Sequence, residues 1–216
     1  MVFWPGTLLM KITRLFIHGV VLLLLSGINN KSCAQTESVT SRIYFPGSIG
    51  LNLPFDDSRL HLKNGTMLTT ALEYRPLNGN AIFIRFNYDA VHNHYQQVYS
   101  NSPTNVNTGK LSANIFSIGL GYRRKVGVIK MFGILQPGLA INSYDHVNFN
   151  PETISIDQIS RRHLSIKLTS GIEYYLAEHF ALTLESSYFY LSPRGNYKLL
   201  NPGSLNFNIG FTTTLF

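Results

Sequence analysis

The stretch Ser204-Leu-Asn-Phe-Asn-Ile-Gly-Phe-Thr-Thr-Thr-Leu-Phe216 decides the fold class of this chain. Its odd-numbered positions from Leu205 to Leu215 are apolar except for Thr213, whereas its even-numbered positions from Ser204 to Thr214 are small or polar. Successive side chains of a β-strand point to opposite faces, so this pattern predicts a strand with one apolar and one polar face. The apolar face has to be covered by protein or by lipid.

The same alternation recurs along the chain and predicts an all-β protein of eight strands. The predicted strands lie at residues 43–53, 68–75, 82–89, 116–123, 129–142, 164–174, 180–190 and 204–216. The alternation is least regular in the fifth strand, where Pro137-Gly138 predicts a bulge or kink.

Long and short connections alternate between these strands. The long polar segments are 56–65, 92–110, 143–161 and 193–203, and the short ones are 77–79, 124–128 and 177–179. Bacterial outer-membrane barrels have short periplasmic turns and long extracellular loops. The sequence therefore predicts an eight-stranded antiparallel up-and-down transmembrane β-barrel, with both ends of the mature chain in the periplasm.

The turn after the second strand fixes the register of the first tight hairpin. Apolar positions are even-numbered on both sides of Leu77-Asn78-Gly79, so the numbers of two facing residues must have an even sum. A three-residue loop with Gly79 in the left-handed region satisfies this condition, whereas a two-residue loop does not.

The composition agrees with a barrel that faces lipid. Charged residues make up 13 % of the 216 residues, against about 25 % in typical soluble domains. The formal charge is +7; without Lys11, Arg14 and Lys31 of the N-terminal segment, 15 basic and 11 acidic residues remain, or +4. These charges are scattered rather than gathered on one face, so the sequence predicts no nucleic-acid partner.

The N-terminus resembles a secretory signal. The apolar run 15–28 follows Lys11 and Arg14, and small residues precede a predicted cleavage site after Ala34. The run is shorter than the ~20 residues that a membrane-spanning helix needs, so a permanent anchor is the weaker alternative. The predicted organisation is a signal peptide at 1–34, a short periplasmic segment at 35–41 and the barrel at 42–216.

Two further features of the leader leave alternatives. Met10-Lys11-Ile12 is a natural translation start, which would make residues 1–9 an upstream extension. Cys33 is the only cysteine, and its lipidation is a weak alternative because Asn30-Lys31-Ser32 does not resemble a lipobox. Cleavage after Ala34 would leave a mature chain without cysteine or disulfide.

Residues 42–216 resemble the small eight-stranded outer-membrane barrels of the OmpA transmembrane-domain and OmpX type. The resemblance rests on architecture, and it includes a C-terminal strand that ends on an aromatic residue, although Phe216 is out of phase with Leu215. It implies localisation in the bacterial outer membrane, contact with outer-membrane lipid and lipopolysaccharide, and insertion by the barrel-assembly machinery. We expect no cell-wall tethering of the OmpA kind, because no peptidoglycan-binding domain follows the barrel in this sequence.

Eight charged residues have the parity of the barrel interior. They are Glu73, Arg75, Arg85, Asp89, Arg123, Lys167, Glu173 and Glu185. The predicted register brings Glu73 diagonally opposite Arg85, and Glu173 diagonally opposite Glu185, a pair that needs a nearby cation. The group could be a selectivity ring or an acid–base pair, but the favoured interpretation is a paired structural network, because an eight-stranded barrel has little free interior.

His163-Leu164-Ser165 is the one candidate for nucleophilic chemistry. Lipid A deacylases of the PagL type carry a His-x-Ser pair on a barrel strand, and Glu173 could orient His163. The Asn-x-Gly context that follows the serine in that family is absent, because this chain continues Ile166-Lys167-Leu168. The parity also directs His163 and Ser165 inward rather than toward lipid, so we predict no catalytic residue.

The long segments contain a candidate binding surface of aromatic and imidazole side chains. Its members are His92, His94, Tyr95, Tyr99, Phe149 and Tyr197. Rigid aromatic residues among Asn and Ser are typical of recognition loops and of ordinary exposed loops alike. His92 and His94 with Asp145 and His146 could form a metal site, but the favoured expectation is no metal and no cofactor.

The expected function is that of a non-enzymatic outer-membrane barrel, structural or surface-interacting through four long extracellular loops. A narrow channel or small-ligand transporter is the first alternative. A lipid A-modifying enzyme is the second, and a soluble lipocalin-like barrel is the least favoured.

Overall fold

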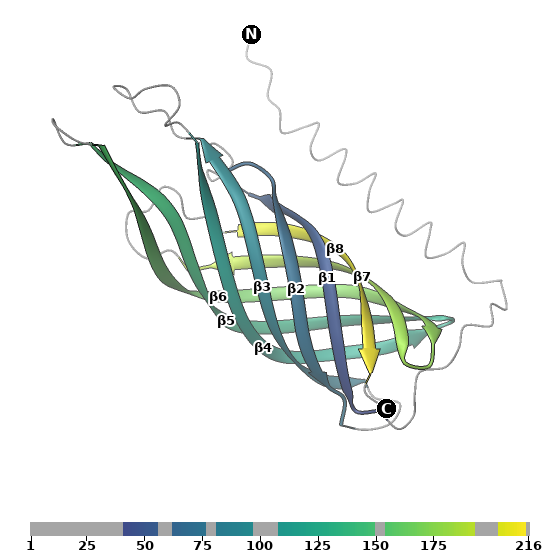
Figure 1. The fold of residues 1–216 in the computed structure, drawn as a ribbon. Helices are drawn as coiled ribbons and strands as arrows, with labels where there is room; N and C mark the ends of the chain where they lie inside the picture. The colour runs from purple at the N-terminus through teal and green to yellow at the C-terminus, as the bar shows by residue number, and fades with distance from the viewer. Residues whose placement is uncertain are drawn as a thin grey trace, which may run out of the picture. The chain divides into compact units, whose positions relative to one another are not determined.

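The barrel domain is an eight-stranded antiparallel sheet that closes on itself. The computed structural model describes residues 41–55, 62–76, 81–96, 108–149, 154–192 and 203–214. Each strand pairs with its neighbours along the chain, and the first strand pairs with the last (Figure 1). The strands are β1 (Ile43–Pro54), β2 (Gly65–Tyr74), β3 (Ile82–Gln96), β4 (Thr108–Val126), β5 (Ile129–Phe149), β6 (Ile154–Ala177), β7 (Phe180–Leu191) and β8 (Gly203–Thr214).

The two faces of the sheet divide as the sequence predicts. Outward residues such as Ile49, Leu120 and Ile209 are about 60 % exposed, at 62 %, 63 % and 61 %, whereas inward residues such as Asn52 and Asn206 are 2 % and 0 % exposed. A soluble protein would bury its apolar residues, so the exposed apolar belt is the face of a barrel that contacts lipid. No helix among the described residues is long and apolar enough to span a membrane.

The strands are strongly staggered around the barrel. Following the paired residues from Ser48 through β2, β3, β4 and β5 leads to His163 on β6, whereas following them through β8 and β7 leads to Glu173. The two positions are ten residues apart (173 minus 163), which is the shear of the barrel. Eight strands at this stagger enclose a space that side chains fill.

Two of the predicted long loops are partly strand, and the second of them, 143–161, is mostly strand. β3 continues to Gln96 and β4 begins at Thr108, so the predicted loop 92–110 was too long. The predicted loop 143–161 was also too long, because β5 continues to Phe149 and β6 begins at Ile154. The extension of β6 lacks the alternation that identified the strands, because both faces of most of residues 155–162 are exposed.

The bulge predicted at Pro137-Gly138 in β5 is not present. Facing residues keep one register on both sides of Pro137, from Leu120 opposite Leu135 to Ser117 opposite Gly138. The predicted turn 124–128 is shorter than expected, since Val126 already pairs with Ile129. Gly127 in this turn has a φ of 61°, a backbone conformation that favours glycine.

The structure describes the predicted tight turn 177–179 but not the predicted turn 77–79. The turn 77–79, including Gly79, lies outside the described residues, but Tyr74 faces Ile84, which gives the even sum that the sequence predicts. Ala177 pairs with Phe180 across the second turn, which confirms a short connection there.

Candidate functional site

The eight predicted interior charges are all buried inside the barrel. None of them is more than 7 % exposed: Glu73 0 %, Arg75 3 %, Arg85 1 %, Asp89 0 %, Arg123 7 %, Lys167 1 %, Glu173 0 % and Glu185 5 %. They number four acids and four bases and lie on β2, β3, β4, β6 and β7, except for Arg75, which directly follows β2. We call these eight residues the charge network.

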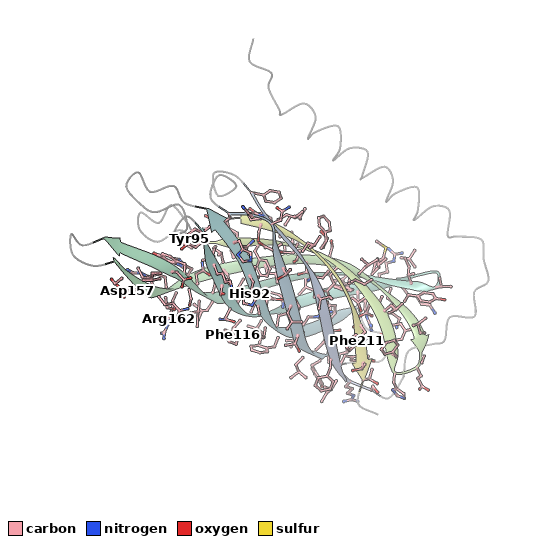
Figure 2. The ribbon with its side chains drawn as sticks, turned by 45° about the horizontal axis from the view of Figure 1, so that its top comes forward. His92, Tyr95, Phe116, Asp157, Arg162 and Phe211 are labelled. Atoms are coloured by element: carbon pink, nitrogen blue, oxygen red, sulfur yellow. The ribbon has the colours of Figure 1, made fainter. Side chains whose placement is uncertain are left out.

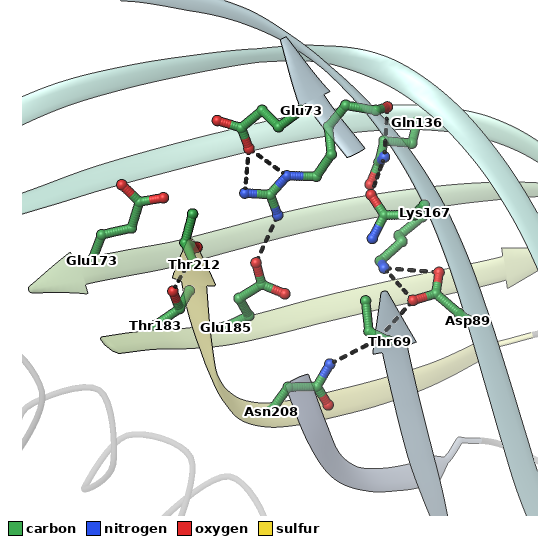
Figure 3. Close-up of polar contacts among 12 residues, drawn as sticks. Thr69, Glu73, Asp89, Gln136, Lys167, Glu173, Thr183, Glu185, Asn208 and Thr212 are labelled. Carbon is green, nitrogen blue, oxygen red and sulfur yellow. Dashed lines mark hydrogen bonds and ion pairs between the residues drawn. The ribbon is translucent and has the colours of Figure 1, made fainter. Parts of the chain in front are cut away.

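Arg85 on β3 connects three strands. Its Nε and Nη2 each lie 2.7 Å from one carboxylate oxygen of Glu73 on β2, and its Nη1 donates to Glu185 on β7 at 2.7 Å (Figure 3). The sequence predicts a diagonal placement of Glu73 and Arg85, but the two residues face each other directly. The register is displaced by two residues from that of a three-residue turn at 77–79.

Glu173 on β6 joins the end of the network nearest the short turns. Arg75 Nη2 lies 2.9 Å from one oxygen of Glu173, and Arg123 Nη1 lies 3.2 Å from the other. Arg75 also contacts Glu73 at 2.5 Å and stacks 3.5 Å above the ring of Tyr44. Glu173 and Glu185 are diagonal neighbours as predicted. Each carboxylate has its own cations: Arg75 and Arg123 contact Glu173, and Arg85 contacts Glu185.

Lys167 and Asp89 form a second group closer to the long-strand end. Lys167 Nζ on β6 lies 2.8 and 2.9 Å from the two oxygens of Asp89 on β3. Asp89 also accepts a bond of 2.7 Å from Thr69 Oγ1, which in turn contacts Asn208 (Figure 3). The Lys167 ammonium lies 5.1 Å from the ring centroid of Phe189, so apolar contacts complete its surroundings.

Sequence reasoning missed the uncharged polar layer beside the ion pairs. Gln136 on β5 is fully buried and donates to Asn87 Oδ1 at 2.7 Å and to the Arg85 carbonyl at 3.3 Å. The sequence signal for this layer was Gln136, a lone glutamine among the apolar residues of β5. The irregular alternation of β5 obscured the face to which Gln136 points. Phe83 and Phe132 pack edge to face at 6.2 Å, with Arg85 4.8 Å above Phe132.

His163 and Ser165 lie in the interior, as their parity predicts. They are 2 % and 3 % exposed, and His163 Nδ1 lies 3.3 Å from the carbonyl oxygen of Ser192. Glu173, the carboxylate that would have to orient His163, lies ten residues further along the same strand (173 minus 163), about 33 Å away at ~3.3 Å per residue.

The structure separates the predicted binding surface into different environments. His92 and His94 are exposed on the outward face of β3, and His92 Nδ1 lies 3.0 Å from Ser112 Oγ. Tyr95, predicted as an exposed loop residue, is instead buried at 4 % exposure because β3 continues through it and turns it inward. Tyr99, Tyr197 and the side chain of Phe149 lie outside the described residues.

Tyr95 belongs to a buried group that we call the outer aromatic cluster. It consists of Leu62, Tyr95, Leu111 and Tyr144, with Ile159 packed against it. The hydroxyl of Tyr95 donates to the backbone carbonyl of Asp145. Within the described part of the chain, no group of three metal-ligating side chains occurs, and the side chain of His146 is outside it.

The family model of the outer membrane protein beta-barrel domain matches residues 20–212. The chain belongs to this family. Membership confirms the resemblance seen in the sequence and locates the protein in the bacterial outer membrane, where its exposed apolar belt meets lipid. No curated protein matches the chain.

Solved outer-membrane barrels share the fold at low identity. Neisserial surface protein A is 14 % identical with a TM-score of 0.50, and the match covers 80 % of this chain and 97 % of the chain of that protein. OprG from Pseudomonas aeruginosa is 13 % identical with a TM-score of 0.51, at 83 % and 98 % coverage. A major outer membrane protein from Thermus thermophilus is 13 % identical with a TM-score of 0.51, at 80 % and 99 % coverage. At these identities the likeness shows the fold alone.

Proposed function

We propose that this protein is a non-enzymatic, non-conducting outer-membrane barrel that displays an interaction surface on the outer ends of its long strands. The observation behind the proposal is the charge network, in which four acids and four bases pair across the interior (Figure 3). Buried charges are tolerated when they are paired, and here the pairs occupy the space that a pore would need.

The unequal lengths of the strands support the display of a surface. β6 has 24 residues and β5 has 21, whereas β1, β7 and β8 each have 12. About 9–11 residues of a tilted strand cross a bilayer. β4 and β5 meet at Val126 and Ile129, so the additional length of β5 and β6 extends from the opposite end (Figure 1).

The extended part of β6 has the exposure of a strand in water. Ser155–Gln158 are exposed on both faces, as are Arg161 and Arg162. Asp157, Arg162 and His92 lie toward this end of the barrel, away from Phe211 (Figure 2). We call residues 141–149 and 154–163 the outer wall. In the family's topology, the end with the longer connections faces the outside of the cell.

Conductance in planar lipid bilayers tests the closed interior. The purified protein is expected to give no stepwise current in KCl, while a large-pore porin in the same membrane gives resolved steps. Reproducible steps that scale with KCl concentration would support the channel alternative instead.

Site-specific labelling of intact cells tests the displayed surface. In a Cys33→Ser background, Gln158→Cys on the outer wall should react with a membrane-impermeant maleimide. The matched variant Glu178→Cys in the β6–β7 turn should react only after the outer membrane is permeabilised. Labelling of residue 178 in intact cells would reverse the proposed orientation.

The proposal of a non-enzymatic barrel is supported by the inward positions of His163 and Ser165 and by their distance from Glu173. Mass spectra of lipid A from cells with and without the protein should be identical. A changed acyl pattern that Ser165→Ala abolishes would make the protein a lipid enzyme.

A further inference from the structure

The β4–β5 hairpin carries unbalanced positive charge at the end of the barrel with the short turns. From Arg123 to Met131 the sequence is Arg-Arg-Lys-Val-Gly-Val-Ile-Lys-Met, with four bases and no acid. Arg123 points inward and pairs with Glu173. Among the described residues, Arg124 and Lys125 form no ion pair, and both are exposed.

A groove opens on the outer surface beside these two cations. Its volume is about 580 Å³. Its lining residues are Tyr122, Arg124, Lys125, Val126, Met131, Phe132 and Gly133. Most of this lining is apolar, and the two basic residues lie toward the hairpin turn, where Val126 pairs with Ile129.

The floor of the groove exists because a glycine occupies an outward position. Gly133 faces Tyr122 on β4 and Ser170 on β6, and Ser170 faces Ser186 on β7. A Cβ at Gly133 would have no atom nearer than 4.0 Å, so the position is open rather than filled by a neighbour. The neighbouring outward positions on β6 are Leu168 and Ile172, so Gly133, Ser170 and Ser186 are a row of small residues across three strands within an apolar belt.

We propose that this groove binds an anionic glycerophospholipid of the periplasmic leaflet. Arg124, on the outward face with Tyr122 and Met131, would contact the phosphate of its headgroup. Lys125 has the inward parity of Arg123 but is exposed at the end of the hairpin, where it would add positive charge beside the headgroup. An acyl chain would lie against Met131 and over Gly133. The short-turn end of a family barrel faces the periplasm, so the cations lie at headgroup height and the apolar lining lies at the height of the acyl chains. Cations near an anionic lipid surface each contribute about a five-fold preference for the charged headgroup.

The lining of the groove has a basic part and an apolar part, and together they favour a lipid over a soluble anion as the ligand. A free phosphate would satisfy the cations but not the apolar floor, and an uncharged lipid would satisfy the floor but not the cations. A lipid with a net negative headgroup matches both parts.

Tryptophan quenching by brominated lipid tests the proposal directly. The reporter is Tyr122→Trp in the full chain, combined with Trp4→Phe so that it is the only tryptophan. In phosphatidylcholine vesicles, a small fraction of phosphatidylglycerol with brominated acyl chains is expected to quench the reporter several-fold more strongly than the same fraction of brominated phosphatidylcholine. Equal quenching by the two lipids would overturn the proposal.

Three variants assign the binding to the groove. Arg124→Gln with Lys125→Gln should abolish the excess quenching by phosphatidylglycerol, and Gly133→Leu should abolish it by filling the floor. The matched control Arg162→Gln, an exposed arginine on the outer wall, should retain it. An excess that survives either groove substitution, or that disappears in the control, would contradict the assignment. Folding of each variant is checked by circular dichroism.

Discussion

The charge network and the outer aromatic cluster fill the same interior by different means. The network joins β2, β3, β4, β6 and β7 through ion pairs between residues that are far apart in sequence. The outer aromatic cluster packs Leu62 against the extended ends of β3, β4, β5 and β6 through apolar contact, and the hydroxyl of Tyr95 donates to the Asp145 carbonyl. The comparison teaches that charges specify partners in the part of the barrel that crosses the membrane, whereas simple burial is sufficient beyond it.

The largest expected effect is from Arg85→Met. It leaves the buried carboxylates of Glu73 and Glu185 without their shared cation, and removing one partner of a buried ion pair costs about 3–5 kcal/mol. Urea unfolding of the protein in lipid vesicles, followed by circular dichroism, measures the loss. A loss below about 1 kcal/mol would mean that the network contributes little to stability.

The second group of the network allows a compensation test. Lys167→Met alone strands the Asp89 carboxylate and should cost about 3 kcal/mol of unfolding free energy. Adding Asp89→Asn removes that charge and keeps an acceptor for Thr69, so the double variant should recover most of the loss. The same urea titration measures both, and a double variant less stable than Lys167→Met would be inconsistent with a paired group.

A smaller effect is expected in the outer aromatic cluster. Tyr95→Phe keeps the buried ring and removes the hydroxyl that donates to the Asp145 carbonyl, so it should cost about 1 kcal/mol. Unfolding in the same vesicles provides the comparison with Arg85→Met. A cost as large as that of Arg85→Met would erase the distinction between the two regions.

The smallest effect is expected at Ser165. Its Oγ is buried without a hydrogen-bond partner among the described residues, so Ser165→Ala should change the unfolding free energy by less than about 0.5 kcal/mol. A large loss of stability would show that the hydroxyl is bound within the interior, for example through water.

The sequence predicted the faces of the strands because lipid imposes a strict apolar alternation within the membrane. Leu68, Phe86 and Leu184 face outward for this reason, and Glu73 and Lys167 inward. The outer wall was predicted as loop because no lipid constrains Gln158 or Arg161, and alternation therefore disappears where the membrane ends.

The partners within the network could be predicted only in part. The pair Glu73–Arg85 follows from a neighbouring hairpin, whereas Lys167–Asp89 and Arg75–Glu173 cross the interior. Such contacts depend on the stagger of the closed barrel, which local alternation does not specify. The outward position of Gly133 was likewise hidden, because the pattern in β5 was irregular.

The pairing of charges across the interior is the central claim, and a double-mutant cycle on Arg85 and Glu185 tests it most directly. These residues lie on β3 and β7 and contact each other at 2.7 Å. Unfolding free energies of Arg85→Met, Glu185→Gln and the double variant give the coupling between them. The account predicts a coupling of about 1.5–3 kcal/mol. Effects that add to within about 0.5 kcal/mol would contradict it.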